Sequence, residues 1–211
     1  MMAFPNWFRR ESPRSETGPR DLARQLAVLE KEAEQAVQGF QGSSLNRAGD
    51  LCIKAGKHDD ALTYFGRAID AMLEDEQPEQ ARAVAKKIIR LHPEAIRTLC
   101  TLTWLDVASG HMANALVHLG EYVAGARRGH REGLAAAQIL AMARLANDKM
   151  FLEAAAEALD RLDHMEEAVQ VLDWASSGGS PQAIQDPADL SVACLRAAVG
   201  SNARRTDDSV A

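Results

Sequence analysis

The sequence predicts an all-α fold, and two observations carry this prediction. Hydrophobic residues make up 46% of the 211 residues while aromatic residues make up only 5%, and the runs of Val, Ile, Thr and Tyr that favour strands are missing. Helical stretches of about 12 to 16 residues alternate with short breaks rich in Gly, Pro, Asn or Asp. A chain of this length suits one domain or an elongated helical repeat.

The chain is expected to begin with an arm and then a helix. Pro5, Pro13 and Pro19 are separated by Ser and Arg, a composition that does not form a packed core, so residues 1–20 are predicted to be extended. In residues 21–40 apolar side chains recur at spacings of three and four, which predicts an amphipathic helix. These side chains are Leu22, Leu26, Leu29, Ala33, Val37 and Phe40.

The stretch LNRAGDLCIKAGKHDDALTYFGRAI carries the clearest motif in the chain. Small and large apolar residues alternate in it at fixed offsets: Leu45, Ala48, Gly49, Cys52, Gly56, Ala61, Phe65 and Ala68. This pattern resembles the tetratricopeptide repeat (TPR) family, in which small residues allow two helices of a hairpin to cross closely. Gly49 and Ala61 would then lie at the crossing, with Phe65 filling the gap beside it.

The resemblance extends over residues 43–176, with degenerate later copies. Ala81 and Ala115 are separated by one full period of the family, whereas the step from Ala61 to Ala81 is much shorter and interrupts that period. Thr103 occupies a position where the family pattern expects Gly. The expected architecture is a set of antiparallel helix hairpins that form a short α-solenoid or an irregular bundle.

Three segments complete the predicted organisation. Residues 177–186, with the sequence SGGSPQAIQD, are predicted to form a linker, and residues 187–200 are predicted to form a terminal helix of the capping type that closes a helical repeat. Residues 201–211 are a polar tail.

Charge and cysteine usage exclude several classes of function. Residues 1–20 hold four Arg and two Glu while the whole chain has a formal charge of -6, and an acidic body repels nucleic acid. Cys52, Cys100 and Cys194 are odd in number and lack metal-binding spacings, which predicts buried thiols in a reducing compartment. Without a secretory signal or an apolar run of spanning length, the expected location is cytoplasmic or peripheral at a membrane surface.

Enzymatic function is not expected. His58, His111 and His164 recur shortly before Ala61, Ala115 and Ala168 in successive repeats, but no carboxylate or Cys partner stands at metal spacing, which favours solvated turn residues over a row of ligands. The phosphate-binding, zinc-protease and nucleophile-elbow motifs are missing as well. No catalytic residue, cofactor or metal is therefore predicted.

The family resemblance implies candidate binding residues, because TPR ligands usually lie in the groove lined by the first helices of the hairpins. It places Asn46, Asp50 and Lys54 in the groove of the first repeat and Arg97 and Trp104 in that of a later one. The negative charge of Asp50 would repel a carboxylate, which disfavours an adaptor for chaperone tails. Trp104 either anchors a partner peptide or packs in the core.

The N-terminal arm offers a second candidate site. It carries Phe4, Trp7 and Phe8 beside Arg9 and Arg10, and aromatic rings next to Arg suit an interface pocket or the headgroup layer of a membrane. A frayed terminus is the third interpretation. Lipid contact by so short a segment would be weak and would need a second contact through the scaffold.

Together these observations predict a non-catalytic protein-binding scaffold. Its expected role is that of an accessory, stabilising subunit docked on a larger cytoplasmic or membrane-peripheral complex, such as a membrane-embedded bioenergetic or secretion complex. The alternative is a free-standing TPR adaptor or regulator that binds partner peptides transiently. Nucleic acid is not an expected partner.

Overall fold

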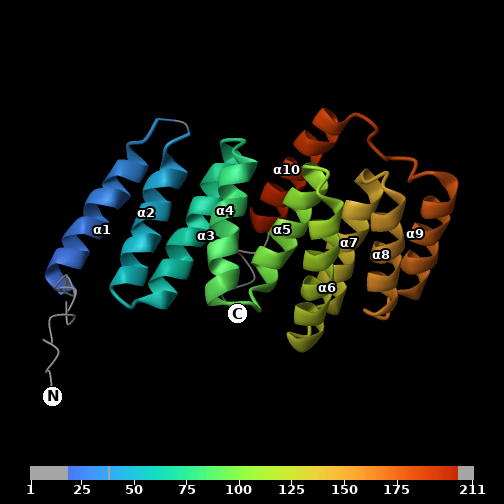
Figure 1. Cartoon of the computed structure of the whole chain (residues 1–211), viewed down its shortest axis with the longest axis horizontal. Helices are drawn as coiled ribbons and strands as arrows, with labels where there is room; N and C mark the ends of the chain where they lie inside the picture. Colours follow the sequence, from blue (N-terminus) through green and yellow to red (C-terminus); the bar gives the residue numbers. More distant parts are fainter. Residues whose placement is uncertain (1–18, 38, 204–211) are drawn as a thin grey trace, which may run out of the picture.

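The computed structural model describes residues 19–37 and 39–203, and within them it contains ten α-helices and no strand. The helices are α1 (Pro19–Glu34), α2 (Gln41–Lys54), α3 (His58–Glu74), α4 (Pro78–Leu91), α5 (Ile96–Ala108), α6 (Met112–Arg128), α7 (Glu132–Leu145), α8 (Lys149–Asp160), α9 (Met165–Ser177) and α10 (Pro187–Ala203). Neighbouring helices up to α9 pack side by side in an elongated stack, with α1 at one end and α9 at the other (Figure 1). The all-α prediction is confirmed.

The stack has two layers. Helices two apart in the chain are joined by side-chain hydrogen bonds: Tyr64 to Glu30 for α3 and α1, Arg97 to Asp70 for α5 and α3, Trp104 to Gln138 for α5 and α7, and Lys87 to Asp50 for α4 and α2. Direct packing of α6 on α8 and of α7 on α9 continues both rows. The odd-numbered helices α1 to α9 therefore form one layer, and the even-numbered helices α2 to α8 form the other.

The helix starts recur with a longer period than that of the family pattern. The fourth residue of five helices is a buried alanine: Ala61 in α3, Ala81 in α4, Ala115 in α6, Ala135 in α7 and Ala168 in α9. Short and long steps alternate along this series, and the step from Ala115 to Ala135 has the same length as the step from Ala61 to Ala81. The short step that interrupts the sequence pattern is therefore itself repeated, and the recurring unit spans three helices: α2 to α4, α5 to α7, and α8 to α10.

The turns follow the same period. Gly56, Gly110 and Asp163 lie between the first and second helices of the three units, and their φ angles are +74°, +68° and +64°. Glycine adopts this left-handed conformation freely, and Asp is one of the few other residues that tolerate it. Glu76 and His130 take φ angles of +55° and +52° at equivalent places, between the second and third helices of the first two units.

The third unit departs from this plan because α9 is one turn shorter than its equivalents. α3 and α6 have 17 residues each and α9 has 13. Gly178 follows α9 in the left-handed conformation, with φ of +87°, and Gly179 donates its backbone N–H to the carbonyl of Trp174. This arrangement ends a helix without strain. The chain then continues as a linker of residues 178–186.

The linker carries α10 away from α9. The Ser180 hydroxyl donates to the carbonyl of Arg144 at 2.7 Å, and the Ile184 N–H donates to the carbonyl of Leu145 at 3.0 Å, which fixes the linker at the end of α7. From there α10 packs mainly on α5 and also on α3 and α7 (Figure 1). The prediction that the terminal helix caps the end of the repeat is therefore corrected: α10 covers the middle of the odd-numbered layer.

The centre of the core is α5. Every residue from Thr98 to Ala108 is buried, because α4, α6, α7 and α10 pack around this helix. Its sequence, IRTLCTLTWLDVA, has apolar side chains on nearly all sides, which is the pattern of a helix enclosed by others.

The first helix is shorter than predicted. α1 ends at Glu34, whereas the predicted helix continues to residue 40.

The thiols test whether α10 stays docked. Cys194 lies on the buried side of α10, and burial raises its pKa to about 12; burial also raises the pKa of Cys52, with Asp60 adding to the shift. The reactive species is the thiolate. At pH 8 we therefore expect Cys194 of the native chain to react with a thiol reagent at least ~100-fold more slowly than in the denatured chain. Labelling followed by peptide mass spectrometry measures this, and fast labelling of Cys194 alone would show that α10 detaches.

Candidate functional site

The candidate residues on α2 lie beside α4. The Lys87 Nζ donates to the Asn46 Oδ1 at 2.9 Å and to the Asp50 Oδ1 at 2.6 Å, and it also stands 5.1 Å from the centre of the Phe65 ring. Lys54 is exposed one turn further along α2. The charge of Asp50 is therefore compensated within the chain, by a residue 37 positions away that the sequence pattern did not single out.

The candidate residues on α5 differ from each other in exposure. Arg97 is half-buried and binds the Asp70 carboxylate, with 2.8 Å from its Nη2 to each carboxylate oxygen. Trp104 is 1% exposed, and its Nε1 donates to the Gln138 Oε1 at 3.2 Å. Of the two interpretations of Trp104, the structure agrees with the one in which the ring packs in the core. As the chain is folded, the ring offers no surface to a partner.

The predicted groove does not bring these residues together. Asn46, Asp50 and Lys54 belong to α2 in the even-numbered layer, whereas Arg97 and Trp104 belong to α5 in the odd-numbered layer. The cause is α4, an additional helix between the hairpin α2–α3 and the hairpin α5–α6. Because layers alternate along the chain, α4 moves α5, the first helix of the second hairpin, into the other layer. The single groove that the family resemblance implies is therefore corrected to two separate surfaces. Phe4, Trp7, Phe8, Arg9 and Arg10 lie outside the described residues.

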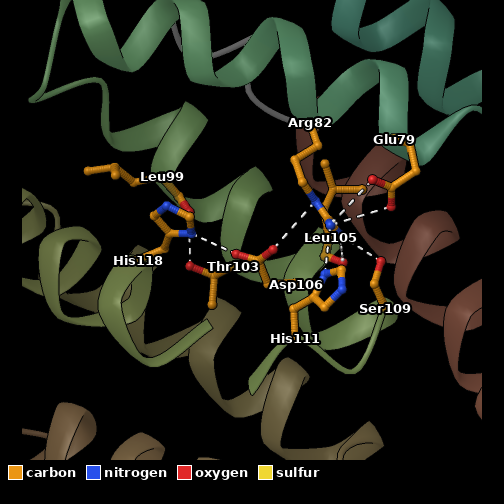
Figure 2. Close-up of polar contacts among 9 residues, drawn as sticks. All are labelled: Glu79, Arg82, Leu99, Thr103, Leu105, Asp106, Ser109, His111 and His118. Carbon is orange, nitrogen blue, oxygen red and sulfur yellow. Dashed lines mark hydrogen bonds and ion pairs between the residues drawn. The ribbon is translucent and has the colours of Figure 1, made fainter. Parts of the chain in front are cut away.

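A buried charged network joins α4 to the hairpin of α5 and α6 (Figure 2). The side chains of Arg82 and Asp106 are 7% and 1% exposed, and the Arg82 Nε lies 3.4 Å from the Asp106 Oδ1. The second oxygen of Asp106 accepts a hydrogen bond from the His118 Nδ1 at 2.7 Å. Asp106 thus holds one group from α4 and one from α6.

The remaining contacts of Arg82 gather the ends of three helices (Figure 2). Its Nη2 donates to the Leu105 carbonyl at 2.8 Å and to the Ser109 hydroxyl at 2.6 Å. Its Nη1 lies 2.7 Å from the His111 Nδ1, which must accept because a guanidinium only donates. Glu79, whose side chain is exposed, adds an ion pair to Arg82 at 3.4 Å. These contacts fix α4 against the turn between α5 and α6, so the network has a structural role.

The three histidines that recur in the sequence start equivalent helices. His58 is the first residue of α3, and His111 and His164 immediately precede α6 and α9. His111 binds Arg82, and the His164 Nδ1 lies 3.3 Å from the Glu167 Oε1. Among the described residues, no group of three or more His, Cys, Asp or Glu side chains is placed to hold a metal ion.

The end of the stack carries an uncovered apolar row. Met165, Val169 and Leu172 of α9 are 62%, 60% and 48% exposed, and their spacing of four and three residues places them on one side of the helix. An adjacent side of α9 is buried against α8 through Ala168, Val171 and Ala175. The sequence indicates this exposed row, because α9 carries two apolar rows, whereas a helix at the end of a repeat packs on one neighbour and requires only one.

In the other two units the position equivalent to Leu172 is covered. Phe65 in α3, Leu119 in α6 and Leu172 in α9 each stand four residues after the buried alanine of their helix, and they are 1%, 2% and 48% exposed. In the first two units a third helix, α4 or α7, packs against α3 or α6. In the third unit α10 is carried to the middle of the stack. The uncovered row of α9, Met165, Val169 and Leu172, therefore lies where a following helix would pack.

Comparisons with models of known protein families, with curated proteins and with solved structures give no significant match in any of the three. Across residues 19–37 and 39–203, no helix is both long enough and apolar enough to cross a membrane.

Proposed function

We propose that this protein is a non-catalytic protein-binding scaffold that acts as a stabilising subunit of a larger cytoplasmic or membrane-peripheral assembly. Its binding surface is the uncovered row of α9 together with the N-terminal arm. The hairpins α2–α3, α5–α6 and α8–α9 are degenerate TPR-like units in this proposal. The position of Gly49 against the Phe65 ring supports that assignment, because an added Cβ would lie 2.5 Å from a ring carbon.

The observation that carries the proposal is the exposure of Leu172. A helical repeat ends in a unit whose outer face is polar, because an apolar face at the end favours association. In this chain Leu172, Val169 and Met165 remain exposed although the chain contains a further helix that could have covered them. Binding of a partner would remove this apolar surface from water, which contributes roughly 25 cal/mol per Å².

The arm supplies a second contact in the same proposal. It joins the scaffold at Pro19, at the end of the stack opposite α9 (Figure 1). Two binding segments in one chain raise the overall affinity for an assembly that contacts both, because binding at the first makes the second intramolecular. This supports a subunit of an assembly in preference to an adaptor that binds one peptide at a time.

The test is purification of the tagged chain from its native host, from cytosol and membranes separately. We expect partner proteins to co-purify with it in a fixed stoichiometry. With the double variant Val169→Gln, Leu172→Gln, the amount of co-purified partner should fall at least tenfold, because two exposed apolar contacts are removed. The control is Val117→Gln on α6, a residue with a similar exposure of 59%. Equal loss with the control, or no loss with either, would contradict the proposal.

A further inference from the structure

The uncovered row of α9 has an acidic border. Glu166 and Asp173 are both exposed and stand one residue after Met165 and Leu172, so they line the same edge of the row. A helix that packs on the row would therefore be favoured by positive charge along this edge.

The opposite end of the stack has the complementary character. On the outer face of α1, Arg24 and Lys31 are exposed on either side of Val28, which is 52% exposed. A hollow of about 330 Å³ opens beside them, with Val28 and Leu29 among its lining residues. The other residues that line it are Asp21, Arg24, Gln25, Glu32 and Arg47, and Glu32 is paired with Arg47 at 3.3 Å.

Pairing of α9 with α9 of another copy is disfavoured by charge. In an antiparallel pair centred on Val169, Glu166 of one copy would lie beside Asp173 of the other, at both ends of the contact. Like charges placed side by side oppose association. At the α1 end the exposed Arg24 and Lys31 would meet those acidic groups, and of the two acidic residues that line the hollow, Asp21 and Glu32, Glu32 is paired with Arg47.

We propose that the occupant of the α9 row is the α1 end of a second copy, so that the helix stack of one chain continues into the next. Met165, Val169 and Leu172 would pack on Val28 and the hollow beside it, with Glu166 and Asp173 facing Arg24 and Lys31. The two surfaces are different, so an assembly of any length keeps one free surface at each of its two ends, and the contact builds open chains instead of closed dimers. This inference rests on the binding role proposed for α9 and names its partner.

Sedimentation of the purified full-length chain tests it. The average mass is expected to rise with protein concentration between about 1 μM and 1 mM. The individual species should differ by 22.9 kDa, the mass of one chain. The variant Val169→Gln, Leu172→Gln should weaken association at least tenfold and Val117→Gln should leave it unchanged. A chain that stays monomeric throughout this range would overturn the inference.

Charge reversal identifies the two faces. Glu166→Lys with Asp173→Lys, and separately Arg24→Glu with Lys31→Glu, should each weaken association by about tenfold at low salt. An equimolar mixture of the two variants should recover it, because each reversed face then meets its complement. If the Arg24 and Lys31 variant alone associates as well as the unchanged chain, the α1 face is not the occupant and the inference is wrong.

The two proposals fail separately. If the purified chain stays monomeric while Val169→Gln with Leu172→Gln still removes a stoichiometric partner from the native preparation, the self-association is wrong and the scaffold function is retained. If the double variant changes neither measurement, both are wrong.

Discussion

Replacing Asp106 by Ala is expected to lower the free energy of unfolding by about 3 to 5 kcal/mol, which would be one of the largest effects of any single substitution in this chain. Its side chain is 1% exposed, and its two oxygens face the Arg82 Nε and the His118 Nδ1. Without the carboxylate, the buried Arg82 guanidinium would keep only one ion pair, with Glu79, whose side chain is 70% exposed. Urea unfolding followed by circular dichroism measures the loss.

Two comparisons isolate the buried charge as the cause. Asp50→Ala removes the partner of Lys87 from a pair that is 33% and 45% exposed, and it should lower stability by less than about 1 kcal/mol. The double variant Arg82→Met, Asp106→Leu removes both charges and should lose less than Asp106→Ala alone. A loss for Asp106→Ala no larger than that for Asp50→Ala would show that the network contributes little.

The helical class and most helix positions follow from local information. Gly56 and Gly110 mark two of the hairpin turns, and Pro78 begins α4 as its first residue, because these residues restrict or free the backbone within one or two positions. The all-round apolar pattern of α5 was also visible. The family resemblance assigns Arg97 and Trp104 of this helix to a groove, whereas hydrophobic residues on every side of a helix indicate that other helices enclose it.

The arrangement of helices in layers could not be read from the sequence in the same way. Whether the step from Ala61 to Ala81 interrupts the repeat or belongs to a longer unit is decided by its second occurrence, from Ala115 to Ala135, and a template with the family period hides that occurrence. The destination of α10 depends on Ser180 reaching the Arg144 carbonyl, 36 positions earlier. Contacts of this length are decided by the packed whole and leave little local signal.

The candidate binding surface shows the same division. The apolar residues of α9 were visible as a repeat of the second-helix pattern, but their exposure follows only from where α10 goes. Lys87, which compensates Asp50, lies in a helix that the family pattern did not place beside α2. The charges at the two ends, Arg24 on α1 and Glu166 on α9, acquire meaning only once those helices are known to end the stack.

Gly49→Leu is expected to destabilise the chain by about 1 to 3 kcal/mol or more. A Cβ at Gly49 would lie 2.5 Å from the Phe65 Cε1 and 2.6 Å from its Cδ1, inside the distance that real contacts allow. Phe65 is 1% exposed, and because protein cores are close-packed the ring could move only by displacing its neighbours. In the same hairpin, Gly66 has open space around its Cα, so Gly66→Ala should raise stability by up to about 1 kcal/mol through helix propensity alone.

The second unit offers a sharper test of the same crossing. Thr103 and Leu119 occupy the positions of Gly49 and Phe65 one unit later, and both are buried, so a larger residue on one helix accompanies a smaller one on the other. Gly49→Thr alone should be destabilising because of the ring, and adding Phe65→Leu should recover part of the loss. A double-mutant cycle measured by urea unfolding gives the coupling, expected at about 0.5 to 3 kcal/mol in favour of the pair. Independent effects of the two substitutions would mean that the two units do not share this helix crossing.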